Sequence, residues 1–414
     1  MIISDYILVI ISTYLALIAY KEIVYSQSTN LYNYAILIIY ILNCTPVFMD
    51  IVFGIPTYPV WYSGFTMSQG NPVVRLIYNV YIIFVLGGLF LFNSRMRNKS
   101  TYQILGSKKF VLNKFWLYLG TLLPFIHIVL SPYISNYLVY GQITNRNIPV
   151  KFNNINASLI LVSIVCFSEL FFKGKRKSLV LFLLFNFLII WINGKRNILI
   201  ILLFLYMFYY NSYINKKNNY LKYIVPLAGI AIVLFSVFYL IQTRKSIDAN
   251  FEDMYLNYRI DFGRDDVTKF VIYRELIEKN PIHDYRLQGL ISILFIWIPR
   301  SIWLNKPYLH YRYLTAELVN LTPTTIHFGM TPSILEQFIS DFGWIGIFLT
   351  PIILIILLNY SNNRITVLEK VILLLLIINL LSMGFDYMLI YFIFIVIYRL
   401  LVNLTKISRG NLTL

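Results

Sequence analysis

The chain has 414 residues, of which 58% are hydrophobic and only 13% are charged. A soluble globular domain carries about 25% charged residues, so this composition argues against a water-soluble protein. The formal net charge of +17 does not indicate a nucleic-acid partner. The Lys and Arg residues stand mostly between apolar runs, which is the positive-inside pattern of membrane proteins. The runs are continuous and do not alternate with polar residues, which excludes an outer-membrane β-barrel.

Apolar runs of about 17–25 residues, the length that a helix needs to cross a bilayer, recur along the chain. The first run, 2–20, lacks the basic region and the small-residue cleavage site of a signal peptide, so we expect it to remain as a span. We therefore predict an all-α polytopic membrane protein. About eleven spanning helices are expected, at 2–20, 32–53, 73–93, 113–131, 156–172, 178–193, 197–213, 222–242, 332–358, 370–386 and 388–404.

Basic segments set the predicted orientation. The three strongest are 94–114, 173–177 and 216–222. All three are cytoplasmic if the amino terminus lies outside, and the carboxyl terminus is then cytoplasmic too. This parity puts both ends of segment 243–331 outside. The apolar run 288–304, which Pro299 interrupts, is therefore predicted to be a re-entrant or interfacial segment.

The same parity predicts three regions: an eight-helix transmembrane region (1–242), an extracytoplasmic loop (243–331) and a three-helix transmembrane region (332–414). Within the loop, residues 243–287 hold nine of the 18 acidic residues of the chain. Asp265-Asp266 is predicted to cap an amphipathic helix that runs to Asn280-Pro281. Its apolar positions repeat at helical spacing.

Four short segments carry candidate functional residues, each with a structural alternative. Gly194-Lys195-Arg196 is either an interfacial anchor or an anion site, since Arg offers a planar fork to phosphate. The charged residues Arg259, Arg264 and Asp265-Asp266 either form salt bridges with one another in a solvated loop or belong to a functional site. No third acidic residue joins the Asp pair, so we predict no metal site.

The other two segments precede or open the predicted span 332–358. Arg300 and Lys306 border the predicted re-entrant turn and are either snorkelling anchors or ligand-binding cations. His327 lies just ahead of Thr331-Pro332-Ser333, which is predicted to cap the following helix. Glu336 stands in the first two turns of that helix.

Taken in order, GKR at 194–196, the loop rich in Arg and Asp, IPRSIWLNKP and MTPSILEQFISDFGWIG give the stretch 190–358 a distinctive pattern. This stretch resembles bacterial oligosaccharide repeat-unit polymerases, the O-antigen or capsule polymerase (Wzy-type) family. The resemblance implies a GT-C-like fold in the plasma membrane. It also implies an enzyme that joins undecaprenyl-pyrophosphate-linked repeat units at the outer face, without a cofactor. A flippase and a chain-length regulator are the protein partners that it implies.

Within the resemblance, Arg196, Arg300 and Lys306 match the basic positions of the family motifs, and Thr331-Pro332-Ser333 match its TPS. In this chain Glu336-Gln337 stands where the family often has Gly-Glu, so the carboxylate is displaced by one position, about 100° around a helix.

The residues and the resemblance lead to one expected mechanism. A pyrophosphate leaving group needs cations placed near the membrane surface. The candidates are Lys195, Arg196, Arg259, Arg264, Arg300 and Lys306. The acceptor hydroxyl needs a base within hydrogen-bond reach, and His327, Asp266 and Glu336 all remain candidates for it. A lipid-linked oligosaccharide flippase or other transporter, an O-antigen ligase and an envelope scaffold are the alternatives. The absence of an internal sequence repeat argues against a transporter.

Overall fold

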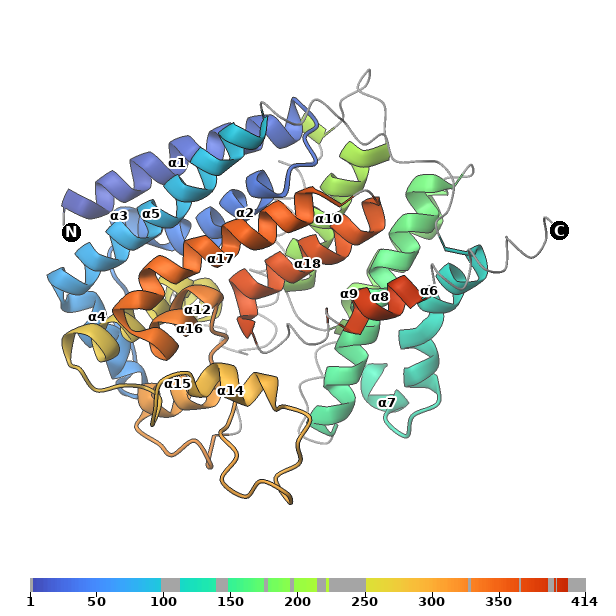
Figure 1. The fold of residues 1–414 in the computed structure, drawn as a ribbon. Coiled ribbons are helices and arrows are strands. Elements are labelled where there is room, and N and C mark those ends of the chain that lie inside the picture. Colours follow the sequence, from blue (N-terminus) through green and yellow to red (C-terminus); the bar gives the residue numbers. More distant parts are fainter. Residues whose placement is uncertain are drawn as a thin grey trace.

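The structure is a computed structural model of the chain. It describes residues 3–97, 112–138, 148–174, 178–193, 197–213, 221–222, 251–326, 329–364, 366–385, 391 and 393–400. These residues form helices and turns and contain no strand (Figure 1). The turn at 194–196 and, apart from its first residue, the predicted span at 222–242 lie outside the described residues.

Within the described residues, five helical segments are long and apolar enough to cross a membrane: Ile3–Val24, Leu31–Phe53, Pro72–Arg95, Phe152–Lys173 and Trp344–Asn362. Three further apolar helices are shorter: Lys114–Val129, Leu179–Asn193 and Ile198–Tyr213. The chain is therefore an all-α membrane protein, as its hydropathy predicts.

The first bundle contains α1 (Ile3–Val24), α2 (Leu31–Ile39), α5 (Pro72–Arg97), α17 (Trp344–Asn362) and α18 (Val367–Met383). A π-helical turn, η1 (Tyr40–Cys44), joins α2 to α3 (Thr45–Phe53). Among the described residues, α1 packs against α2 and α5, and α17 packs against α2, α5 and α18 (Figure 1). These helices bury apolar side chains against one another.

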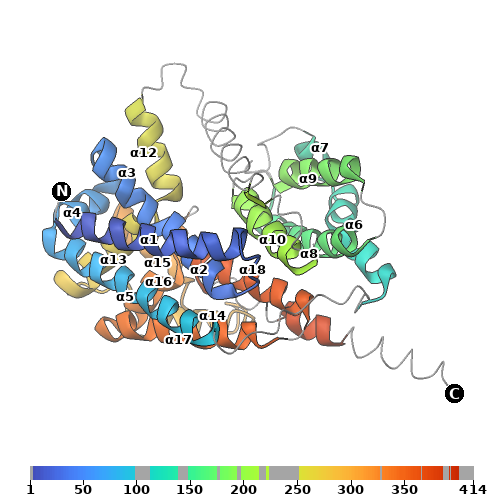
Figure 2. The ribbon, with the colours of Figure 1, turned by 90° about the horizontal axis from the view of Figure 1, so that it is seen from above.

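A second group of helices lies to the other side of α18 from α1 (Figure 2). It consists of α6 (Lys114–Val129), α7 (Ile134–Tyr137), α8 (Val150–Lys173), α9 (Leu179–Asn193) and α10 (Asn197–Tyr213). Contacts of α10 with α18 and of α8 with α18 join it to the first bundle.

Asparagine side chains tie together one end of the first bundle. Asn30 caps α2 by accepting from the N–H of Tyr32. It also donates to Asn93 at 2.6 Å and accepts from Asn362 at 2.8 Å. Asn93 lies near the end of α5, Asn362 ends α17 and Asn30 precedes α2. These three helix ends therefore lie together. Arg364 follows directly at this end.

Short helices form the opposite end. They are η2 (Val60–Tyr62), α4 (Ser63–Gly70), α12 (Phe251–Phe262), α13 (Arg264–Ile272), η4 (Tyr273–Ile277), α14 (Gln288–Leu294), α15 (His310–Val319) and α16 (Ile334–Phe342). Helix α13 packs on α4, α5 and α16, so the predicted amphipathic helix lies against other helices.

The start of α13 differs from the prediction. Gly263 is the N-cap residue and no side chain caps the helix. Asp265 and Asp266 are fully buried in the first turn, where their carboxylates bind Arg259 instead. A buried guanidinium offers a carboxylate a stronger, charge-assisted partner than a backbone N–H.

The predicted span 332–358 was wrong in one respect, because two helices replace it. The chain turns at Gly343, whose φ of +60° is in the left-handed region, and α16 folds back against α17. A Cβ atom at Gly346 would lie 2.1 Å from the carbonyl oxygen of Phe338, so only glycine allows this close approach. Hydropathy reports the length of an apolar run but not a reversal within it.

The apolar run 288–304 contains only α14, which has seven residues, followed by turns. Such a helix is about 10 Å long and cannot cross a bilayer.

Candidate functional site

A cationic loop, residues 295–309, joins α14 to α15 and carries Arg300 and Lys306. Lys306 Nζ donates to the carbonyl oxygens of Ile296 at 2.9 Å and Ile298 at 2.8 Å. Arg300 Nη2 donates to the carbonyl of Pro307 at 3.2 Å. These bonds close the loop on itself.

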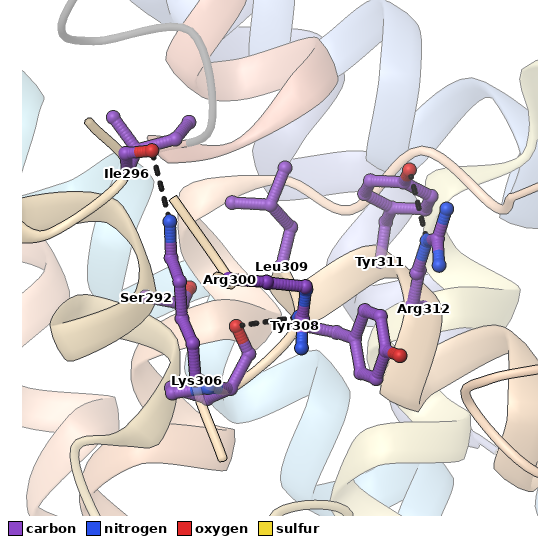
Figure 3. Close-up of a pocket in the computed structure, with 9 residues that line it drawn as sticks. Ser292, Ile296, Arg300, Lys306, Tyr308, Leu309, Tyr311 and Arg312 are labelled. Atoms are coloured by element: carbon purple, nitrogen blue, oxygen red, sulfur yellow. Dashed lines mark hydrogen bonds between the residues drawn. The ribbon is translucent and has the colours of Figure 1, made fainter. Parts of the chain in front are cut away.

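The cations line a pocket of about 240 Å³ (Figure 3). Its lining residues are Ser292, Ile296, Arg300, Lys306, Pro307, Tyr308, Leu309, Tyr311 and Arg312. Three of the nine are cationic and none is acidic. Arg312 comes from the first turn of α15 and was not predicted.

The ring of Tyr308 organises the two arginines. The guanidinium carbon of Arg300 lies 3.7 Å from the ring centroid and that of Arg312 lies 5.0 Å from it. Cation–π contact holds each guanidinium without neutralising it. Among the described residues, no carboxylate forms an ion pair with any of the three cations of the pocket. Burial and the charge of Arg300 lower the pKa of Lys306. A bound anion would relieve this mutual repulsion.

The loop itself carries exposed apolar side chains. Trp297 is 71% exposed, Ile302 77% and Leu304 81%. Large apolar side chains gathered on one exposed loop are typical of a surface that meets lipid or an apolar ligand. The loop therefore combines uncompensated positive charge with an apolar edge, and that combination suits an amphiphilic anion.

A buried ion cluster lies between α3, α4, α12 and α13. Arg259 binds Asp265 through both terminal nitrogens at 2.7 and 2.9 Å, and it contacts Asp266 at 2.6 Å and Asp50 at 3.1 Å. Lys269 Nζ binds Asp265 at 2.9 Å. The side chains of these residues are at most 3% exposed. Two cations thus face three carboxylates in the interior.

The cluster shifts the pKa values of the two carboxylates of α13 in opposite directions. Burial alone would raise the pKa of Asp265, but Arg259 and Lys269 outweigh it and lower this pKa to about 2. Burial, assisted by the charges of Asp265 and Asp50, raises the pKa of Asp266 to about 7. Near pH 7 Asp266 is therefore partly protonated, which brings the cluster close to neutrality.

Glu336 belongs to the start of α16. Ser333 and Glu336 form a capping box, in which each side chain satisfies a backbone N–H of the other end of the turn. The hydroxyl of Thr268 on α13 also donates to Glu336 Oε2 at 3.1 Å, and the positive charge of Arg264 acts on the Glu336 carboxylate. This carboxylate therefore joins α16 to α13.

A chain of three buried groups lies next to the cationic loop, and the sequence did not predict it. His283 Nε2 lies 2.8 Å from His310 Nδ1, and His283 Nδ1 lies 3.2 Å from Asp341 Oδ1. All three residues are at most 2% exposed. The signal in the sequence was weak: two of the four histidines lie on either side of the IPRSIWLNKP motif.

The structure thus brings some predicted residues together and separates others. Arg300 and Lys306 share the pocket, whereas Arg259 and Asp266 share the ion cluster. Arg264 and Glu336 lie between α13 and α16. The remaining predicted residues are Lys195, Arg196 and His327, which lie outside the described residues. No group of metal-ligating side chains occurs among the residues that the structure describes.

Comparison with known proteins finds no match to a protein-family model, to a curated protein or to a solved structure.

Proposed function

We propose that the chain is a membrane-embedded glycosyltransferase. It joins undecaprenyl-pyrophosphate-linked oligosaccharide repeat units into O-antigen or capsular polysaccharide. The observation that carries the proposal is the pocket of Arg300, Lys306 and Arg312, which has no acidic lining residue and lies beside exposed Trp297. A lipid-linked pyrophosphate combines the two chemistries of this loop, a concentrated negative charge and an apolar tail.

The reaction releases a lipid pyrophosphate as the sugar bond forms, so negative charge develops on the leaving oxygen. Arg300, Lys306 and Arg312 supply fixed positive charge for it. Guanidinium groups stay charged at any working pH, and the stacking on Tyr308 holds two of them in place before the substrate arrives.

The base that accepts the proton of the acceptor hydroxyl remains open among His327, Asp266 and Glu336. The carboxylate of Asp266 is bonded to Arg259, Gln69 and Tyr58. A base in that position has to exchange one of these partners for the hydroxyl.

The membrane arrangement that accompanies the proposal has about eleven spans and a GT-C-like fold in the bacterial plasma membrane. The amino terminus and the loop 243–331 face outward. Support for this orientation comes from Arg364, which stands at the bundle end opposite to the cationic loop and adds to the predicted cytoplasmic charge. In this arrangement loop 295–309 meets the outer leaflet.

Deletion of the gene, followed by analysis of the surface glycan, tests the function. A single repeat unit on its lipid anchor is expected. Free lipid-linked polymer would instead indicate a ligase, and repeat units trapped inside the cell would indicate a flippase.

Substitution tests the pocket. Arg300→Ala is expected to abolish long chains while the protein still inserts, because the pocket loses one of its two guanidinium groups. Arg399→Ala, at the other end of the molecule and half-exposed, is the matched control and should leave the chain lengths unchanged. Wild-type chain lengths in the Arg300→Ala strain would refute the role of the pocket.

A further inference from the structure

The cationic loop is fixed at both ends by the same three buried groups. Asp341 on α16 accepts the N–H of Gly289 at 2.9 Å through its carboxylate, and its carbonyl accepts the N–H of Leu287 at 3.2 Å. This holds the start of α14, which leads into the loop. His310 is the first residue of α15, which follows the loop, and it binds His283.

Close packing leaves these groups little freedom. A Cβ atom at Gly289 would lie 2.8 Å from Asp341 Oδ2 and 3.0 Å from His283 Cε1, so a larger residue there would displace these side chains. The loop is therefore clamped between the Asp341 contacts at one end and the His283–His310 hydrogen bond at the other.

The Asp341 carboxylate determines which ring nitrogens of His283 and His310 carry a proton. We assign the proton of His283 to Nδ1, the nitrogen that lies 3.2 Å from Asp341 Oδ1. His283 Nε2 then accepts from His310 Nδ1–H, and His310 Nε2 carries no proton. Among the described residues, neither His310 Nε2 nor His283 Nδ1 has a hydrogen-bond partner. Burial and the nearby His283 lower the pKa of His310 well below its usual value.

One added proton keeps the clamp closed. A proton on His283 Nε2 reverses the bond, because His310 Nδ1 can accept once its own proton sits on Nε2. A second proton leaves two N–H groups facing each other, and the bond is lost.

Other charged or titratable groups surround the pair. Glu275 lies on η4 and is paired with Arg286, whose Nη1 also donates to the carbonyl of Ser340 at 3.0 Å. Asp284 accepts from Gln288 at 3.1 Å. The ring of Tyr313 lies 5.6 Å from that of His283. Glu275 and Arg286 compensate each other, so Asp341 is the carboxylate in direct contact with the pair.

We propose that Asp341, His283 and His310 are positioning residues that hold the cationic loop in its anion-binding shape while at most one histidine is protonated, and release it when both are. Acidification of the outer face then weakens substrate binding. This inference rests on the proposed function only in taking the pocket as the pyrophosphate site.

The test measures binding of inorganic pyrophosphate to the full chain in detergent between pH 8 and pH 5. Pyrophosphate titrates in this range itself, so each measurement is compared with His310→Asn. The Asn amide can donate to His283 or, after rotation, accept from it, and it does not titrate. The variant should therefore bind like the wild type at pH 8. If only a tenth of wild-type molecules keep the loop closed at pH 5, the wild type should bind about tenfold more weakly than His310→Asn there.

Two further variants complete the experiment. His283→Gln keeps an acceptor for His310 on a side chain that gains no proton, so at pH 5 it should bind pyrophosphate about as tightly as His310→Asn. His310→Leu removes the bond and should bind weakly at every pH. Parallel pH profiles for the wild type, His310→Asn and His283→Gln would overturn the inference. No pyrophosphate binding by the wild type at pH 8 would overturn the proposed function of the pocket, and the inference with it.

Discussion

Arg259→Met is the sharpest test of the buried ion cluster. The guanidinium of Arg259 makes three of the four ion-pair contacts that hold Asp50, Asp265 and Asp266. Met fills a similar volume but leaves Lys269 alone against three carboxylates.

Two arguments give the expected loss in free energy of unfolding. Removal of one partner of a buried ion pair costs about 3–5 kcal/mol. The variant can instead protonate Asp265, which at pH 7 costs about 4 kcal/mol for a group with a pKa of about 3.9 in the unfolded chain. The estimates agree, so we expect the free energy of unfolding to fall by about 4 kcal/mol at pH 7.

The pH dependence distinguishes this mechanism from loss of packing. In the wild type, Asp266 has a raised pKa, so its contribution to stability is full at low pH and is lost as pH rises through about 7. The pKa of Asp265 is depressed to about 2, so its contribution changes only below pH 4 or so. In the variant both carboxylates have raised pKa values and both gain stability on acidification. The difference in free energy of unfolding between the wild type and Arg259→Met should therefore narrow by roughly 3 kcal/mol from pH 7 to pH 5.

Reversible unfolding of the detergent-solubilised chain, followed by circular dichroism, measures both quantities. Asp266→Asn is the control, because an amide imitates the protonated acid and should change stability at pH 7 by about 1 kcal/mol or less. A gap that stays constant between pH 7 and pH 5 would show that Arg259 acts by packing and not by charge.

Three further outcomes follow from contacts described above. Gly346→Ala should destabilise the fold, because the new Cβ meets the carbonyl of Phe338, whereas the Cβ of the control Gly87→Ala on α5 meets no atom within 4 Å. Thermal melting compares the two variants, and equal melting temperatures would contradict the close approach of α16 to α17. Ser333→Ala removes the cap of α16 and should cost about 1 kcal/mol in the free energy of unfolding, so an unchanged value would argue against the capping box. Arg312→Gln should weaken pyrophosphate binding several-fold and make it less dependent on salt; titrations at two ionic strengths would show an unchanged salt dependence if Arg312 does not face the anion.

Predictions from the sequence succeed where the deciding contacts are local. A continuous apolar run becomes a helix because its backbone satisfies itself, so α1 and α5 follow directly from hydropathy. Arg300 and Lys306 are six residues apart around a proline turn, and they line one pocket. The mutual salt bridges expected near Arg259 also form.

Predictions fail where distant segments decide the outcome. The salt bridges of Arg259 were expected in a solvated loop, but Asp50 and Gln69, about 200 residues away, enclose them. The pairing of His283 with His310 depends on the path of the loop between them, which no periodicity reports. Polar side chains within 334–342 were the available sign that this part of the predicted span does not face lipid.

The reversal at Gly343 also has a consequence for how the chain is built. Helix α17 has 19 residues, a length of about 28 Å, so it can be accepted by the insertion machinery without α16. An acidic side chain at the centre of an inserting helix costs about 2.5–3.5 kcal/mol, and α16 carries Glu336 and Asp341. Its partners on α5, α13 and α14 are synthesised before it, and those on α17 and α18 after it. Translation therefore delivers α16 to a partly formed site, which α17 and α18 complete.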